Sequence, residues 1–298
     1  MAQVIASFAP LARVGLKDVI DLESKKRTNQ WSVIADKIST KQQFERFDQI
    51  GDFSYATIAA EMGGVTYDTL DRGFTADFYP LMRAIGFRIS IQASYTDLYN
   101  KIKNPGPKLA RAMDATMELE VANLLNNGFS SSYLGIDGVA LFSTAHPLAT
   151  TTTGNKPASS EYTLSSTSLE IALQERRRQK THRGKPYPQT GNVKLVVPPE
   201  LEMVADRIVS SVKLAQTADN DPNVAGRRTT VYVNDYLTST TAWFLLPKED
   251  NPLFLLTRIP RDVVTKFDED TLSYKFVTYE EYIRGWFDWR GTWATSGA

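Results

Sequence analysis

The sequence contains no cysteine and only two histidines among its 298 residues. The absence of cysteine excludes disulfide bonds, thiolate zinc sites and a cysteine nucleophile, and it favours a reducing compartment. The two histidines, His146 and His182, lie far apart in the sequence and do not form an HExxH-type pattern. We therefore expect no metal site, and we interpret His146 as a structural hydrogen-bonding residue.

An excess of one charge is also missing, because 34 basic and 34 acidic residues cancel. Proteins that bind nucleic acid over much of their surface carry a basic excess, so any contact with DNA must be local or weak. No segment approaches the roughly 18 consecutive apolar residues that cross a bilayer. The first residues lack the basic start of a signal peptide, so we expect neither a membrane partner nor a secretion signal.

Catalytic motifs are missing as well. The sequence has no GxSxG elbow beside the Ser143–His146 stretch, and no glycine-rich phosphate loop of either common type. Carboxylates occur in clusters such as 268–270 and 280–281, which indicate solvated turns as readily as an acid–base pair. The sequence thus predicts no cofactor and no enzymatic activity.

The first half of the chain predicts two extended regions. Residues 1–50 mix charges with apolar residues at no sustained period and indicate an arm that lies on another surface; an N-terminal helix packed on its own domain is the alternative. Alternating apolar residues over 85–93 predict a strand. A partner strand over 55–62 would end at Gly63–Gly64, which suits a tight reversal. Together these segments predict a long hairpin over residues 55–93.

The remainder of the chain predicts alternating helices and strands. Pro107 can begin a helix that Asn126–Gly128 would end, and its apolar face is formed by Leu109, Met113, Met117 and Val121. Further on, a Thr- and Ser-rich loop over 150–168 precedes a region of mixed elements. We expect helices over 169–180 and 201–214, and strands over 193–197, 229–233 and 243–246, before an aromatic, strand-rich C-terminal stretch. The predicted class is α+β.

One local cluster of positive charge stands out, formed by Arg176, Arg177, Arg178, Lys180, Arg183 and Lys185. Its arginines could face DNA. Alternatively, cations at the C-terminal end of a helix offset the helix dipole and continue into a solvated turn. We favour the solvated turn.

A series of landmarks in a fixed order is the most specific feature of the sequence. Residues 137–147 read DGVALFSTAHP, and later segments read LVVPPEL (195–201), NVAG (223–226), YL (236–237), AWFL (242–245) and DWRG (288–291). The first segment resembles a stretch found in Mu-like phage major head subunits. The whole order, over roughly residues 50–293, resembles the major capsid proteins of tailed phages, whose fold is named after phage Hong Kong ninety-seven.

This resemblance implies a domain plan. It comprises an N-terminal arm (1–50), an extended E-loop hairpin (51–93), a P-domain with a long spine helix (94–148), a mixed α/β A-domain (149–250) and the return strands of the P-domain (251–298). The spine helix would present Leu109, Met113, Met117 and Val121. Contacts between subunits would come from the E-loop, through Met62, Gly63, Gly64, Val65, Tyr67, Leu70 and Phe74.

The function that the resemblance implies is self-assembly into pentamers and hexamers of an icosahedral shell around double-stranded DNA, without sequence-specific DNA contact. The protein would be part of the virion, assembled in the host cytoplasm with scaffold, portal and decoration proteins as partners. No fused scaffolding leader and no cross-linking pair is recognisable. An encapsulin-like compartment and a small α+β enzyme are the alternatives.

Overall fold

The computed structural model describes residues 22, 28–59, 61, 63–70, 72–96, 105–211 and 223–297. Its helices in the first half of the chain are α2 (Trp31–Ile34), α3 (Ile91–Thr96) and α4 (Pro105–Asn126). Later come α5 (Ser166–Arg177), the 3-10 turn η2 (Pro199–Leu201), α6 (Glu202–Ser210) and α7 (Val224–Arg228). Among the described residues, no helix is both long enough and apolar enough to cross a membrane.

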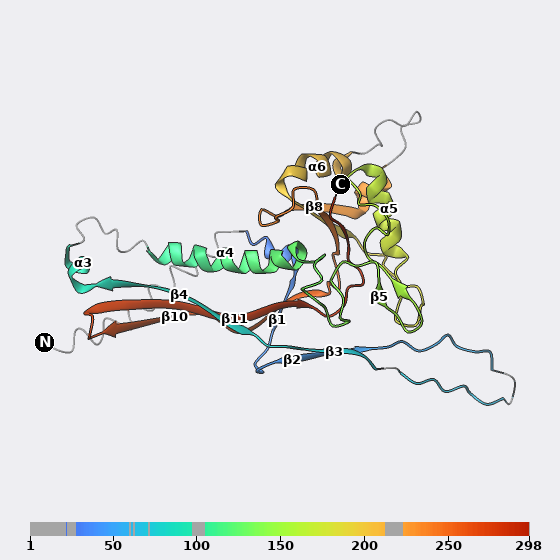
Figure 1. Ribbon diagram of the computed structural model, residues 1–298, viewed down its shortest axis with the longest axis horizontal. Helices are drawn as coiled ribbons and strands as arrows, with labels where there is room; N and C mark the ends of the chain where they lie inside the picture. Colours follow the sequence, from blue (N-terminus) through green and yellow to red (C-terminus); the bar gives the residue numbers. More distant parts are fainter. Residues whose placement is uncertain are drawn as a thin grey trace.

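A long, four-stranded sheet extends to one side of the molecule (Figure 1). Its order is β1 (Asp36–Ser39), β10 (Leu253–Asp268), β11 (Ser273–Trp286) and β4 (Leu81–Ser90), with β1 parallel to β10 and the other pairs antiparallel. Helix α4 runs along one face of this sheet, where Leu109 and Ala110 pack with Val263 and Phe87. This helix confirms the one predicted over 107–127.

A second sheet has the order β12 (Trp293–Thr295), β9 (Trp243–Pro247), β7 (Val193–Val197) and β8 (Thr229–Val233). Both faces of its two central strands, β7 and β9, are buried. Leu195 and Trp243 point into one apolar cluster with α5 and α6, while Val196 and Phe244 point into another cluster with α4 and β10. Burial on both faces explains why β7 and β9 are continuous apolar runs, and the predicted positions of β7, β8 and β9 are confirmed.

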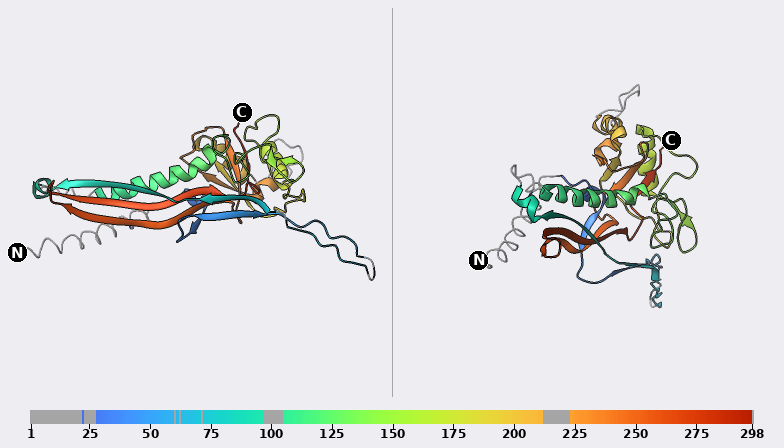
Figure 2. Two further views of the ribbon diagram at one scale, coloured as in Figure 1. Left: turned by 60° about the horizontal axis from the view of Figure 1, so that its bottom comes forward. Right: turned by 60° about the vertical axis from the view of Figure 1, so that its left-hand side comes forward.

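A short ribbon of β2 (Glu45–Ile50) and β3 (Arg72–Phe78) carries the loop formed by residues 51–71, which extends clear of the body (Figure 2). The remaining pair, β5 (His146–Pro147) and β6 (Thr152–Thr153), is a small hairpin. The long sheet and the projecting loop extend in roughly opposite directions from the second sheet (Figure 1).

The predicted pairing of 55–62 with 85–93 is wrong. Residues 51–59 are described and form no strand, while β4 pairs along its full length with β11, for example Phe87 with Phe276. The apolar alternation identified β4 correctly as a strand but could not identify its partner, since both a local hairpin and a distant strand satisfy the same pattern. The ribbon at the base of the loop comes instead from β2, inside the segment interpreted as an arm.

The arm interpretation is also wrong for residues 31–50. Ile34 and Ala35 are fully buried in the cluster around α4, and β1 pairs with the start of β10. This segment is too short for an apolar period to be detectable in the sequence. The burial of a few residues is nevertheless enough to hold it against the body of its own subunit. Residues 1–21 and 23–27 lie outside the described residues, as does the end of the helix expected over 201–214.

Candidate assembly surfaces

The loop of residues 51–71 is shorter than the E-loop hairpin expected over 51–93, because 72–78 and 81–90 form β3 and β4. We keep the name E-loop for residues 51–71, which expose large apolar side chains that contact no core. Ile58 is fully exposed and Tyr67 is 91% exposed. Phe53, Tyr55, Val65 and Leu70 are each at least half exposed. Such a concentration of exposed apolar side chains makes the loop a candidate interaction surface.

The two legs of the E-loop lie side by side. The backbone N–H of Ser54 donates to Asp68 Oδ2 at 2.6 Å, and the hydroxyls of Thr57 and Thr66 are 3.2 Å apart. Of the predicted contact residues, Gly63, Gly64, Val65, Tyr67 and Leu70 are exposed on the E-loop, whereas Phe74 lies half-buried in β3. Met62 lies outside the described residues. The E-loop is also acidic, because residues 51–71 contain four carboxylates and neither lysine nor arginine.

The predicted spine-helix residues have a different environment. Leu109, Met113 and Val121 are buried and Met117 is half-buried against the same subunit. They therefore stabilise the subunit itself.

Between its two apolar contacts, α4 is joined to the sheet by two groups of ion pairs, of which the one around Arg261 is the more buried. Arg261 pairs with Asp114 at 2.7 Å and with Glu280 at 3.2 Å. Burial raises the pKa of Glu280 despite the neighbouring guanidinium. Glu120 pairs with both Arg83 and Arg284. Removing one member of such a cluster would leave a buried charge without its partner.

A groove of about 410 Å3 opens beside the C-terminal half of α4, between the corner that joins β3 to β4 and the loop over 133–136. Exposed Leu81, Tyr133 and Leu134 line it, together with Arg83 and Arg284. The groove therefore combines apolar surface with two cations that share the single carboxylate of Glu120.

The basic cluster is divided by the structure into residues with different roles. Arg176 is only 4% exposed, donates from Nε to the backbone oxygen of Gly291 at 2.6 Å, and has its pKa lowered to about 10 by burial. The solvated-turn interpretation is therefore wrong for Arg176, and its burial equally prevents it from facing DNA. Arg177 and Arg178 are exposed, and Arg183 contacts the E-loop.

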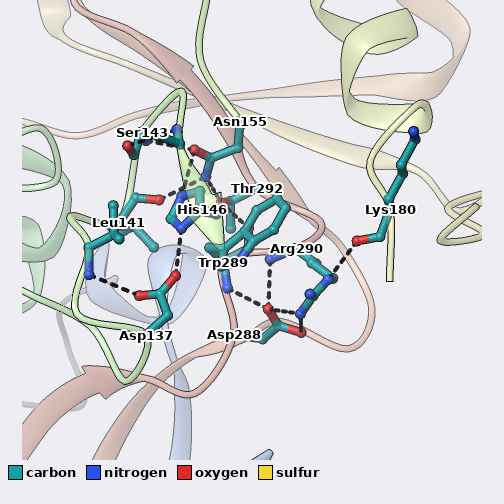
Figure 3. Close-up of polar contacts among 12 residues, drawn as sticks. Asp137, Leu141, Ser143, His146, Asn155, Lys180, Asp288, Trp289, Arg290 and Thr292 are labelled. Atoms are coloured by element: carbon teal, nitrogen blue, oxygen red, sulfur yellow. Dashed lines mark hydrogen bonds and ion pairs between the residues drawn. The ribbon is translucent and has the colours of Figure 1, made fainter. Parts of the chain in front are cut away.

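His146 lies at a buried polar junction with the C-terminal strand region (Figure 3). Its ring stacks on Trp289 with centroids 4.2 Å apart, and Nδ1 lies 2.7 Å from Asp137 Oδ2. Nε2 lies 3.2 Å from Oδ1 of Asn155, whose side-chain amide donates to the backbone oxygen of Leu141 and to Thr292. His146 is thus the structural hydrogen-bonding residue that its sequence context predicts.

The first and the last landmark segments therefore meet in space. Asp137 and His146 come from the first landmark, and Trp289, Arg290 and Gly291 come from the last. Arg290 Nε donates to the backbone oxygen of Lys180 at 2.8 Å, which ties the turn after α5 to the same junction (Figure 3). No pattern in the sequence indicates the role of Asn155, whose contacts depend entirely on the fold.

In the described part of the chain, three apolar clusters stabilise the body of the subunit, and one long loop leaves its large apolar side chains exposed. A family model described as phage capsid protein matches residues 77–295, and the chain belongs to this family. The family is one of structural proteins. A search of curated proteins finds no match.

Solved structures share the fold at low sequence identity. The capsid of cyanophage P-SCSP1u is 10% identical with a TM-score of 0.58, over 90% of this chain and 88% of that one. The capsid of bacteriophage JBD30 is 10% identical with a TM-score of 0.52, over 90% of this chain and 65% of that one. The SrpI encapsulin of Synechococcus elongatus is 11% identical with a TM-score of 0.54, over 91% of this chain and 88% of that one.

Proposed function

We propose that the protein is the major capsid subunit of a tailed phage, which assembles into pentamers and hexamers of a closed icosahedral shell around double-stranded DNA. The observation that carries this proposal is the exposed, apolar E-loop projecting from a body that has its own buried core. Each large apolar side chain that moves from water into an interface contributes about 1.5–3 kcal/mol. Several such residues on one loop can therefore make a substantial contact between copies.

The E-loop would rest on the P-domain of an adjacent copy, near α4. The groove beside α4 supports this placement, since Leu81, Tyr133 and Leu134 offer apolar surface and two arginines lie nearby. Three carboxylates of the E-loop, those other than Asp68, which pairs with Arg183 of the same subunit, would be attracted to these two arginines, which share the single negative charge of Glu120.

The packaged DNA would make no sequence-specific contact. The zero net charge of the chain supports this, because a strongly basic lining would hold the polymer in place. Exposed Arg177 and Arg178 remain the candidates for a local DNA contact. A scaffold, a portal and decoration proteins would be its partners, with assembly in the host cytoplasm and no catalytic role for this chain.

An encapsulin-like compartment that holds protein cargo is the second candidate, favoured by the fold that the chain shares with the SrpI encapsulin. The order of the landmark segments supports the phage capsid instead.

Electron microscopy and sedimentation velocity of the purified protein test the proposal. We expect closed shells or rings of subunits, and nuclease-resistant DNA in shells taken from infected or induced cells. Shells that hold a protein in place of DNA would support the compartment. A discrete monomer at all concentrations would contradict both assembly functions.

A further inference from the structure

The turn after α5 contacts both legs of the E-loop through one side chain. Nη1 of Arg183 donates to Oγ of Ser54 and to Oδ2 of Asp68, each at 2.7 Å, and Nη2 donates to the backbone oxygen of Thr69 at 2.6 Å. Ser54 lies on the outgoing leg, and Asp68 and Thr69 lie on the returning leg. A single guanidinium therefore holds the two legs together where the E-loop leaves the body.

Further interactions on each leg of the E-loop support the contact of Arg183. The backbone N–H of Ser54, followed by the Arg183 guanidinium, holds the pKa of Asp68 well below its usual range. Lys185 Nζ lies 4.7 Å from the centre of the Tyr55 ring, on the outgoing leg. Asp68 therefore stays ionised near neutral pH, as a charge-assisted pair with arginine requires.

The turn itself is firmly attached to the body of the subunit. Thr181 N donates to the backbone oxygen of Lys185 at 2.8 Å, and Gly184 adopts φ +80°, a conformation that suits glycine in a tight turn. Arg290 holds the backbone oxygen of Lys180, and Ala149 N donates to the backbone oxygen of His182 at 2.9 Å. The turn can therefore hold the base of the E-loop in place. Without it, the E-loop would be attached to the body only through β2 and β3.

We infer that Arg183 is a positioning residue for assembly, which latches the root of the E-loop to the turn over 180–186 and so fixes the direction in which the E-loop projects. A two-stranded ribbon is marginally stable in water, and β2–β3 alone would leave the loop a wide range of directions. Fixing one direction before two copies meet lowers the entropy cost of their association. The planar guanidinium suits this role because it makes several hydrogen bonds in one fixed geometry, which lysine cannot reproduce.

The latch is tested by amide hydrogen exchange on the full-length, unassembled subunit. Arg183→Gln should speed exchange at the Ser54 amide, which donates to Asp68, by about tenfold, because the acceptor loses its charged partner. Arg183→Lys should give an intermediate value. Arg207→Gln, which removes an exposed arginine on α6, should leave exchange in the E-loop unchanged. The melting temperature should be the same in all four proteins, since the latch lies outside the core.

Unchanged exchange at Ser54 in Arg183→Gln would overturn the inference. If that variant also loses melting temperature, Ser54→Ala decides, since it removes one acceptor of Arg183 and keeps Asp68 as the acceptor of the backbone N–H at position 54. Exchange at this amide that is faster by more than the intrinsic difference between alanine and serine supports the latch, and exchange unchanged beyond that difference rejects it.

The role of the latch in assembly rests on the proposed function, but the exchange result does not. A matched assembly assay should show shells forming about tenfold more slowly with Arg183→Gln than with Arg207→Gln. Faster exchange with an unchanged assembly rate would reject the assembly role while leaving the contact itself established. Failure of the wild-type protein to form any shell would count against the proposed function alone.

Discussion

Helix α4 and the E-loop contain similar apolar residues in opposite surroundings. Val121 on α4 is fully buried within its own subunit, whereas Ile58 on the E-loop is fully exposed. The free energy of burying α4 therefore stabilises the folded subunit, whereas the corresponding free energy for the E-loop is available only when a second surface covers it. The comparison separates the residues that fold the subunit from those expected to assemble it.

The largest expected effect on subunit stability comes from truncating the core beside α4. Leu125 is fully buried, so Leu125→Ala should lower the free energy of unfolding by about 3 kcal/mol through lost burial and the cavity left behind. Ile58→Ala should change it by less than about 0.5 kcal/mol. Urea unfolding of unassembled subunits measures both, and equal losses would break the comparison.

A similar loss is expected at the polar junction. His146→Phe preserves a ring that can stack on Trp289 but removes both polar contacts of the imidazole, leaving the buried Asp137 carboxylate without its partner. We expect the free energy of unfolding, measured by urea unfolding, to fall by about 3 kcal/mol.

The control for this change is His182→Gln, at a half-exposed position whose backbone oxygen makes the contact with Ala149. It should change stability by less than about 0.5 kcal/mol. A loss as large as that of His146→Phe would show that the buried junction has no special importance.

A smaller, pH-dependent effect is expected where α2 meets α4. Glu118 is buried and accepts the backbone N–H of Gln30 at 2.8 Å, and burial raises its pKa, with Asp114 and Asp235 adding to the shift. Because the folded state binds this proton more readily than the unfolded state, the contribution of Glu118 to stability increases as the pH falls through its raised pKa.

Glu118→Gln keeps an acceptor for Gln30 and removes the charge. Its stability relative to wild type should therefore be highest at pH 7 and should decline towards pH 4, as the wild-type carboxyl becomes protonated. Urea unfolding at the two pH values measures the difference. A relative stability that is unchanged or rises on acidification would contradict the role of the buried charge.

Elements with a strong internal pattern could be predicted from the sequence. The spacing of Leu109, Met113 and Val121 defined α4 to within two residues at its N-terminus, and the apolar run over 193–197 matched β7. Both elements bury apolar faces whose period is visible without knowledge of their partners.

Pairings and single contacts could not be predicted in this way. The alternation over 85–91 does not reveal that β4 pairs with β11, almost two hundred residues further along the chain. Similarly, Arg176 and Arg183 look alike in the sequence, yet one is buried against Gly291 and the other holds Asp68. Their roles depend on which distant segments the fold brings beside them.

Shell formation by a subunit with a shortened E-loop tests the central claim most directly. Because the Thr57 and Thr66 hydroxyls are 3.2 Å apart, residues 58–65 can be removed and the two legs joined through a Gly-Gly turn, which leaves Asp68 and Arg183 in place. We predict a subunit with unchanged circular dichroism and urea midpoint that forms no stable shells in sedimentation velocity and electron microscopy. Normal shells from this variant would contradict the assembly role of the E-loop, and an unfolded subunit would show that the segment belongs to the core.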